Sequence, residues 1–368
     1  MRRYIYSVLA LVLLTNVGPR PGYAALPPPN HLDQALAALA AENGSIEFTD
    51  WSLLKQYEGV SSLTSAGPEA PRMRFFASLD QDQTAFSAYD IAYAATHAKN
   101  WSWDSTDLVW EAAAVGVAAP PTQVLRFRSD FNFAPVVAHF RQRGFTQGSY
   151  HGVPVYSHPM GLAADWALTT GFSTYNTAVL ASRHLLVLSL SLSAVHATLD
   201  VLRGARPSFA GDPAIDAAAT GLGTTASSVI FTGTQACRIF SPRLVLGPAA
   251  TSAAIAALRH KYAVDNVHRY DALAIGYRDQ GARPLGYMVL RYANRAVALA
   301  DLPIRRSIAQ SGISPLIDEP YSHLFTLEQA VVAGNAVVLT MQPVSGRPQV
   351  FVDMVATGDL AFAWRPCG

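Results

Sequence analysis

Short runs in which apolar and polar residues alternate recur along this chain, and most of them follow one another with only short connections. This alternation has the period of a half-buried strand. Two examples lie at residues 107–112 and 122–128, and Pro120 and Pro121 mark the turn between them. Short connections favour antiparallel pairing, since a doubly wound parallel sheet places a helix after each strand. The sequence therefore predicts an α+β fold, with antiparallel or mixed sheets faced by helices.

Helix start and stop signals stand between these runs. Residues 43–59 are typical of a strand followed by a helix, with Thr49 or Asp50 as the N-cap and Gly59 just past the end. The other elements expected in this half are a loop at 61–71, a helix at 84–97, a helix capped by Asn132 and ended by Gly144, two strands within 177–192, a helix capped by Ser193 that carries Val195, Leu199 and Leu202, a helix that starts at Asp212 and Pro213, and a strand at 227–232.

A comparable alternation fills the second half of the chain. The elements expected there are a helix at 250–261, strands at 272–277 and 286–292, a helix after Pro303, and strands at 336–341, 349–355 and 360–364. The length exceeds what one core usually holds, so we expect two domains or one domain built of two similar halves. The predicted divisions are 1–24, 25–245 and 246–368, with the C-terminal half packed on the first.

The first 24 residues have the three parts of a signal peptide. Arg2 and Arg3 are basic, residues 5–14 are apolar, and Gly22 and Ala24 are the small residues that a signal peptidase reads. The apolar run is too short for a membrane anchor. We therefore expect a secreted or extracytoplasmic protein, in the periplasm or at the cell surface.

The composition narrows the class of protein further. Hydrophobic residues make up 50% of the chain and charged residues 14%, which argues against disorder. No stretch after the signal peptide is long and apolar enough to span a membrane. The formal net charge is +1 and the basic residues are dispersed, so the footprint of a nucleic-acid-binding protein is missing. The expected partner is an unknown ligand or a component of the cell envelope.

The chain has two cysteines, Cys237 and Cys367. In an oxidising compartment an even pair in a chain so poor in thiols favours a disulfide. Such a bond would tie the C-terminus to the middle of the protein.

One part of the chain resembles a known group of proteins. Residues 177–233 alternate strand, small polar turn and helix, with Ser208, Asp212 and Pro213 at the start of the second helix. Together with the capped helix within 129–145, this stretch resembles uncharacterised exported bacterial proteins that carry repeated strand, strand, helix modules. The resemblance covers about a third of the chain and implies a fold; it carries over no catalytic residue.

Motifs of known catalytic classes are missing or isolated. Ser52 and Lys55 fit the Ser-x-x-Lys start of serine acyl-enzymes, but the companion motifs are absent, and we interpret the match as a helical turn that presents Lys55 to solvent. The chain has no Gly-x-Ser-x-Gly elbow and no glycine-rich phosphate-binding loop. We therefore assign no catalytic residue and no cofactor.

A group of aromatic and histidine side chains is the best candidate for a binding site. Tyr150, His151, Tyr156 and His158 lie on or just after a predicted strand over 150–156, where they could form a polar-aromatic patch at a sheet edge that binds sugars or peptides. His151 and His158 with Asp165 could also hold a metal. Their spacing matches no standard metal-binding motif, so we assign no metal site.

These observations favour a non-enzymatic exported protein that binds a ligand or a partner at the cell envelope or outside the cell. The alternative is a secreted hydrolase that uses a glycosidase-like carboxylate pair, because such pairs need no local motif. Asp50, Glu111 and Asp165 are the carboxylates to examine for that activity. A solute-binding protein of a transporter fits the length and the export, but the C-terminal half lacks the strand-helix repetition of such folds.

Overall fold

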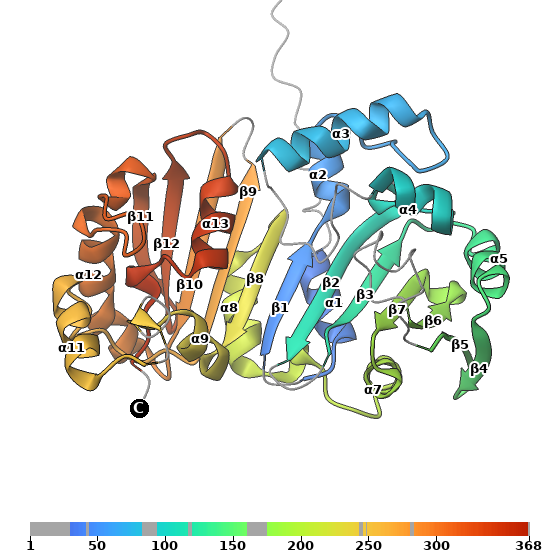
Figure 1. Cartoon of the computed structure of the whole chain (residues 1–368). Coiled ribbons are helices and arrows are strands. Elements are labelled where there is room, and N and C mark those ends of the chain that lie inside the picture. The colour runs from blue at the N-terminus through green and yellow to red at the C-terminus, as the bar shows by residue number, and fades with distance from the viewer. Residues whose placement is uncertain are drawn as a thin grey trace, which may run out of the picture.

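The chain folds around one open antiparallel sheet of 12 strands, in the order β11-β12-β10-β9-β8-β1-β2-β3-β7-β6-β5-β4 (Figure 1). The computed structural model describes residues 30–41, 44–82, 94–116, 120–159, 175–242, 246–247, 249–279 and 283–366. The strands are β1 (Gly44–Thr49), β2 (Leu108–Gly116), β3 (Thr122–Phe127), β4 (Thr146–Tyr150), β5 (Val153–Ser157), β6 (Asn176–Leu180), β7 (Leu185–Ser189), β8 (Ser227–Thr232), β9 (Ala272–Asp279), β10 (Pro284–Arg291), β11 (Phe325–Ala333) and β12 (Ala336–Pro343).

Helices cover both faces of this sheet. The α-helices are α1 (His31–Ala38), α2 (Trp51–Tyr57), α3 (Glu69–Asp82), α4 (Ala94–Trp101), α5 (Ala134–Gln142), α7 (Leu192–Leu202), α8 (Pro213–Leu222), α9 (Gly233–Ile239), α11 (Ser252–Lys261), α12 (Arg295–Ser311) and α13 (Gln349–Thr357). Short 3₁₀ turns are η2 (Ser105–Asp107), η3 (Ala181–Arg183), η4 (Phe209–Gly211), η5 (Tyr321–His323) and η6 (Ala361–Ala363). The predicted α+β fold with a helix-faced antiparallel sheet is confirmed.

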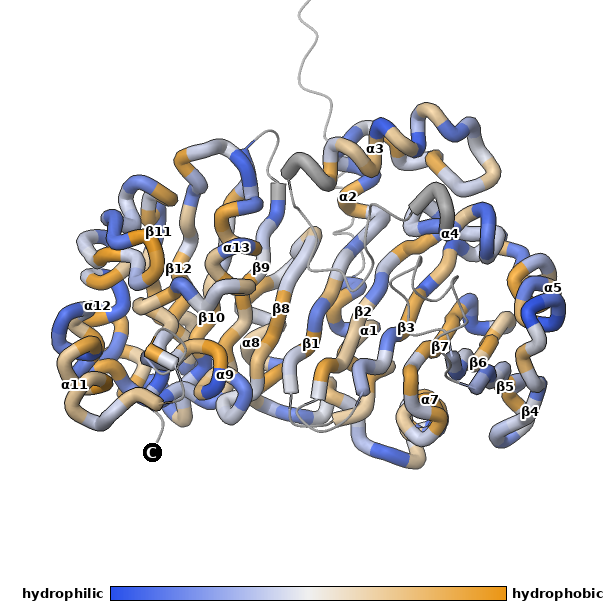
Figure 2. Tube along the Cα trace, viewed as in Figure 1, coloured by the Kyte–Doolittle hydropathy of each residue, from blue (hydrophilic) through white to orange (hydrophobic). Residues whose placement is uncertain are grey.

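Alternation along the strands sends side chains to two different helical layers. In β9, Leu273 and Ile275 face the core under α9, α12 and α13, whereas Ala272 and Ala274 face the core under α1, α7 and α8. A third core lies under α2, α3, α4 and α5, over the strands nearest β4. In Figure 1, α9 and α13 lie in front of the sheet and α1 and α8 behind it. Figure 2 shows hydrophobic residues along the strands and on α7.

The sheet is continuous across the predicted boundary between residues 245 and 246. β8 comes before this boundary and β9 after it, and the two strands pair from Ser227–Tyr277 to Thr232–Ala272. The division into two halves stays a prediction, as does the signal peptide over residues 1–24, which lies outside the described residues.

Local start and stop signals predicted several elements correctly. Asp50 caps α2, since its carboxylate accepts a hydrogen bond from the Leu53 backbone N–H at 2.9 Å. Asp212 caps α8 in the same way, with Pro213 at the first helical position. The strand predicted at 227–232 is β8.

Other predicted boundaries were wrong. The N-cap of α7 is Ser191 rather than Ser193: the Ser191 hydroxyl accepts from the Ala194 N–H. α12 does not begin after Pro303 but contains it, because the Asn294 side chain caps the helix nine residues earlier.

Two predicted strands in the C-terminal segment are also wrong. Residues 349–355 belong to helix α13, and residues 361–363 form the 3₁₀ turn η6. A short apolar run fits a strand and a buried helix equally well, and here Phe351, Met354 and Val355 pack on one core at helical spacing. The strand β11 and the helix α3 were not expected from the sequence, and most of the helix expected at 84–97 lies outside the described residues.

Candidate functional site

A tight hairpin at the edge of the sheet positions the predicted site residues. β4 and β5 pair from Thr146–Ser157 to Tyr150–Val153, which leaves His151 and Gly152 as a two-residue turn. Both have positive φ, 51° and 81°, as a type I′ turn requires. The expectation of one strand over residues 150–156 was therefore wrong, because the His-Gly pair reverses the chain.

Pro154 explains why β5 and β6 separate next to this turn. The two strands pair at Ser157–Asn176, Tyr156–Thr177 and Val155–Ala178, and the ladder ends there. Proline has no backbone N–H, so Pro154 cannot complete the next pair of ladder hydrogen bonds. The space beyond the last pair is open between two strands of the same sheet.

A cavity of about 700 Å³ occupies this opening, within the size range of small-molecule sites. The lining residues come from α5 and the residue before it (Phe133, Ala134, Val137, Arg141), the hairpin (His151, Gly152, Val153, Pro154, Tyr156), the β6 end with η3 (Val179, Leu180, Ala181, Ser182, Arg183) and the last turn of α7 (Leu199, Leu202, Arg203). Most of these side chains are apolar, so the walls suit an apolar ligand.

Three arginines line the cavity, and no Asp or Glu among the described residues does. Arg141 lies in the last turn of α5, Arg183 ends η3, and Arg203 is the C-cap of α7. All three are exposed. The Arg183 Nη1 donates to the Leu202 carbonyl oxygen at 2.7 Å, which joins η3 to α7 across the cavity wall.

A polar-aromatic group lies beside the cavity. The Tyr150 ring stacks on His196 with centroids 3.8 Å apart and planes at 7°, and it meets the His151 ring edge-on at 4.2 Å. The Tyr150 hydroxyl donates to the Asp200 carboxylate at 3.1 Å, and the His151 Nε2 lies 3.8 Å from Asp200 Oδ1. Desolvation and the Asp200 carboxylate raise the pKa of the Tyr150 hydroxyl.

Only two of the four predicted ligand-binding residues line the cavity. His151 and Tyr156 line the cavity, and Tyr156 is also stacked on Phe140 with centroids 5.0 Å apart. Tyr150 lies beside the cavity. His158 does not line it, since its ring packs near Phe145 at 5.2 Å. Tyr150 lies on the edge strand β4, whereas Tyr156 is buried on β5, and ligand binding by these residues stays a prediction.

Sequence reasoning missed the three arginines and the residues that α7 contributes. Arg141, Arg183 and Arg203 are separated by 20 residues or more, and each looks like an ordinary solvated charge near the end of a helix or turn. Only the tertiary arrangement of α5, η3 and α7 brings them to one cavity.

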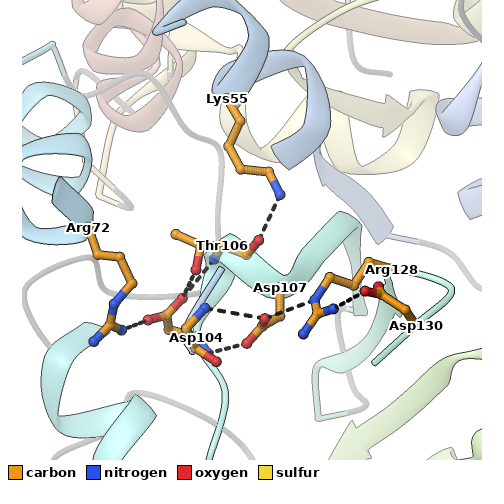
Figure 3. A network of polar contacts seen from close by, with 8 residues as sticks. Lys55, Arg72, Asp104, Thr106, Asp107, Arg128 and Asp130 are labelled. Carbon is orange, nitrogen blue, oxygen red and sulfur yellow. Dashed lines mark hydrogen bonds and ion pairs between the residues drawn. The ribbon is translucent and has the colours of Figure 1, made fainter. Parts of the chain in front are cut away.

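A second polar cluster, shown in Figure 3, joins α2, α3 and η2 to the end of β3. The Asp104 carboxylate pairs with the Arg72 guanidinium and accepts from the Thr106 N–H at 2.9 Å. The Lys55 Nζ donates to the Thr106 carbonyl oxygen at 2.7 Å. Burial raises the pKa of Asp104 and lowers the pKa of Lys55. The expectation that Lys55 faces solvent was therefore wrong.

The same cluster continues through Asp107 to the surface. The Arg128 Nε donates to Asp107 Oδ1 at 3.2 Å, and the Arg128 Nη1 pairs with Asp130 Oδ2 at 2.6 Å (Figure 3). Three basic and three acidic side chains balance one another in this cluster. We interpret it as a clamp between elements of the fold rather than as a ligand site.

The carboxylates considered for hydrolysis do not meet at the cavity. Asp50 caps α2 and pairs with the His31 Nδ1 at 2.8 Å. Glu111 is buried on the central strand β2, and Asp165 lies outside the described residues. Among the residues that the structure describes, no group of three or more His, Cys, Asp or Glu is placed to hold a metal ion.

The predicted disulfide has one described partner. Cys367 lies outside the described residues, so the bond stays a prediction. The Arg365 Nη1 donates to Cys237 Sγ at 2.6 Å, so the chain two residues before Cys367 lies against Cys237.

Comparisons with known proteins identify no family. No family model and no curated protein matches the chain. Among solved structures, crystal form I of TP0453 matches with a TM-score of 0.42 and 11% identity, over 89% of this chain and 97% of that one. Crystal form III of TP0453 gives a TM-score of 0.42 and 10% identity, over 88% and 97%. A similarity this low carries no functional argument, and the resemblance to uncharacterised exported bacterial proteins stays a prediction.

No helix in the described ranges is long and apolar enough to cross a membrane.

Proposed function

We propose that this chain is an exported, non-enzymatic protein that binds an apolar small molecule in the cavity between the β4–β5 hairpin, η3, α5 and α7. The observation that carries the proposal is the cavity itself: about 700 Å³ of space with mostly apolar walls, opened where Pro154 ends the pairing of β5 with β6. Concave apolar sites with a few polar groups are where proteins bind small molecules.

The walls of this cavity are held in place by the surrounding fold. Leu199 on α7 is 1% exposed and belongs to the core behind the sheet, while Tyr156 is 2% exposed and belongs to the core in front of it. A ligand would therefore enter a site that exists before binding, which lowers the entropic cost of association.

The side chains at the cavity favour binding over turnover. A hydrolytic site needs an acid and a base, or a nucleophile beside its base. Neither Asp50 nor Glu111 lines the cavity, and Asp200 is engaged by the hydroxyl of Tyr150. The described residues supply no carboxylate pair at this cavity to support the alternative of a glycosidase-like hydrolase, and Asp165 lies outside them.

The export part of the proposal depends on the N-terminal sequence. Arg2 and Arg3 followed by the apolar residues 5–14 are the motivating feature. N-terminal sequencing of the protein from an expressing bacterial culture should give a chain that starts near Ala25. A secreted or envelope fraction that still begins at Met1 would contradict it.

Binding can be tested with Nile red, a neutral apolar dye whose fluorescence rises in apolar surroundings. We expect saturable binding to the purified protein, weakened about tenfold by Ala134→Trp, which corresponds to about 1.4 kcal/mol. Ala134 lines the cavity from the first turn of α5, so a tryptophan there would fill part of it. Gln142→Trp is the matched control, because Gln142 is exposed on the same helix and does not line the cavity.

Equal dye affinity in both tryptophan variants and the unaltered protein would contradict the proposed site. The non-enzymatic part has its own test. Hydrolysis of p-nitrophenyl dodecanoate that exceeds the buffer rate and is lost in Ala134→Trp would show that the cavity is an active site.

A further inference from the structure

We infer that the ligand of this cavity is an anionic amphiphile, with a single apolar chain and a carboxylate or phosphate head that the arginines bind. The inference rests on the proposed function and names the chemical class of the ligand. It depends on the arrangement of three guanidinium groups around walls that are otherwise apolar.

The three arginines reach the cavity from three separate elements. Within the described ranges none of Arg141, Arg183 and Arg203 forms an ion pair, and no Asp or Glu lines the cavity. Arg183 donates to a backbone carbonyl, and the Arg141 Nη2 lies 3.5 Å from the neutral Gln147 side chain. The local positive charge therefore has no carboxylate of the cavity wall to balance it.

Like charges that gather at one site repel one another unless an anion joins them. The planar guanidinium group offers paired N–H donors that match carboxylate and phosphate oxygens. An anionic head would satisfy several of these donors at once. A cationic head would meet repulsion at the same place, which gives selectivity by charge.

The arginines and the apolar walls define how such a ligand would lie. The three arginines are exposed, so a charged head beside them remains partly in water and is not costly to bind. Val137, Val153 and Leu202 line the cavity and supply apolar surface for the chain. The carboxylate of Asp200 on α7 accepts a hydrogen bond from the Tyr150 hydroxyl, and Asp200 is not among the lining residues. It therefore does not occupy the place beside the arginines where the anionic head would bind.

Isothermal titration calorimetry on the purified protein can test the class of ligand. The probes are dodecanoate, dodecanol, dodecyltrimethylammonium and acetate, each below its aggregation concentration. We expect dodecanoate to bind about tenfold or more tightly than dodecanol, and acetate and dodecyltrimethylammonium to bind more weakly than either. Added salt should weaken the binding of dodecanoate more than that of dodecanol.

The arginine contribution is isolated by a pair of variants with the same change in charge. Arg203→Gln should weaken dodecanoate about tenfold and leave dodecanol unchanged. Arg306→Gln, at an exposed position on the distant helix α12, should change neither affinity.

The outcomes separate this inference from the proposed function. Equal affinities for dodecanoate and dodecanol, both weakened by Ala134→Trp, would overturn the anionic head and keep the apolar site. Acetate binding as tightly as dodecanoate would overturn the amphiphile in favour of a plain anion. No binding of any probe would overturn the inference and the proposed function together.

Discussion

The Nδ1 of His97 lies 2.9 Å from the carbonyl oxygen of Trp103, and the two rings meet edge-on with centroids 4.0 Å apart. His97 is fully buried. Desolvation lowers the pKa of this imidazole from 6.5 to about 3. The ring is therefore neutral in the folded protein and donates its Nδ1–H to the carbonyl, which couples α4 to the segment that leads into η2.

This pKa shift predicts how stability depends on pH. Above pH 6.5 His97 is neutral in both the folded and the unfolded chain. As the pH falls from 6.5 toward 3, the unfolded chain takes up a proton that the folded chain excludes, so the free energy of unfolding falls by about 1.4 kcal/mol for each pH unit. Between pH 6.5 and 5 the expected loss from this residue is about 2 kcal/mol.

Urea unfolding followed across that window provides the measurement. His97→Gln should flatten the pH dependence, because glutamine does not titrate. Gln142→Ala, a change between non-titrating side chains at an exposed position of α5, is the control, and it should leave the slope as it is. A slope that persists undiminished in His97→Gln would assign the pH dependence to other groups.

The packing of α7 behind the sheet gives a second prediction. Leu199 is 1% exposed and shares a core with Leu185 and Val187 of β7, as the apolar stripe of this helix predicted. Leu199→Ala should lower the free energy of unfolding by about 2–5 kcal/mol, through lost burial and the cavity left behind. Leu192→Ala, at the exposed start of the same helix, should cost less than about 1 kcal/mol. Equal losses in urea unfolding would mean that α7 is oriented differently.

The buried ion pair between Arg72 and Asp104 gives a third prediction. Asp104→Ala leaves the Arg72 charge buried without its partner, and the expected loss in unfolding free energy is about 3–5 kcal/mol. The control is Lys261→Met, which breaks the exposed pair with Asp318 and should leave the free energy of unfolding nearly unchanged. If Asp104→Ala does not fold, the double variant Arg72→Met with Asp104→Leu should, because it removes both charges. A double variant less stable than Asp104→Ala alone would contradict this account of the pair.

Local signals in the sequence predicted those elements whose ends are decided within a few residues. Asp50 and Asp212 bond to backbone N–H groups two or three residues ahead, so a short window contains the whole interaction. The order of strands depends on contacts that no window contains. β1 lies between β2 and β8, and the Ser227 hydroxyl donates to the Phe48 carbonyl oxygen across 179 residues.

The candidate site also combines residues that the sequence predicted with residues that it did not. His151 and Tyr156 both line the cavity and are close in sequence. The clustering of aromatic and histidine side chains in this short stretch was enough to predict them as site residues. Arg141, Arg183 and Arg203 meet only because α5 and α7 lie on opposite faces of the sheet beside η3. The hairpin at His151 was missed because a run of β-formers hid a two-residue turn, although His-Gly allows the positive φ that the turn needs.

The last prediction is that Cys237 and Cys367 form a disulfide in the exported protein. Arg365 contacts Cys237 Sγ at 2.6 Å, so the C-terminal segment already lies beside the first cysteine. The bond would close a loop of about 130 residues, for which the chain-entropy model gives about 5 kcal/mol before any strain is subtracted. Cys237→Ser, Cys367→Ser and the double variant should then lose the same stability, because each removes the same bond. Intact mass before and after reduction, with alkylation of free thiols, measures the bond directly. Two thiols that alkylate without reductant, or single losses that add up in the double variant, would show that the cysteines act independently.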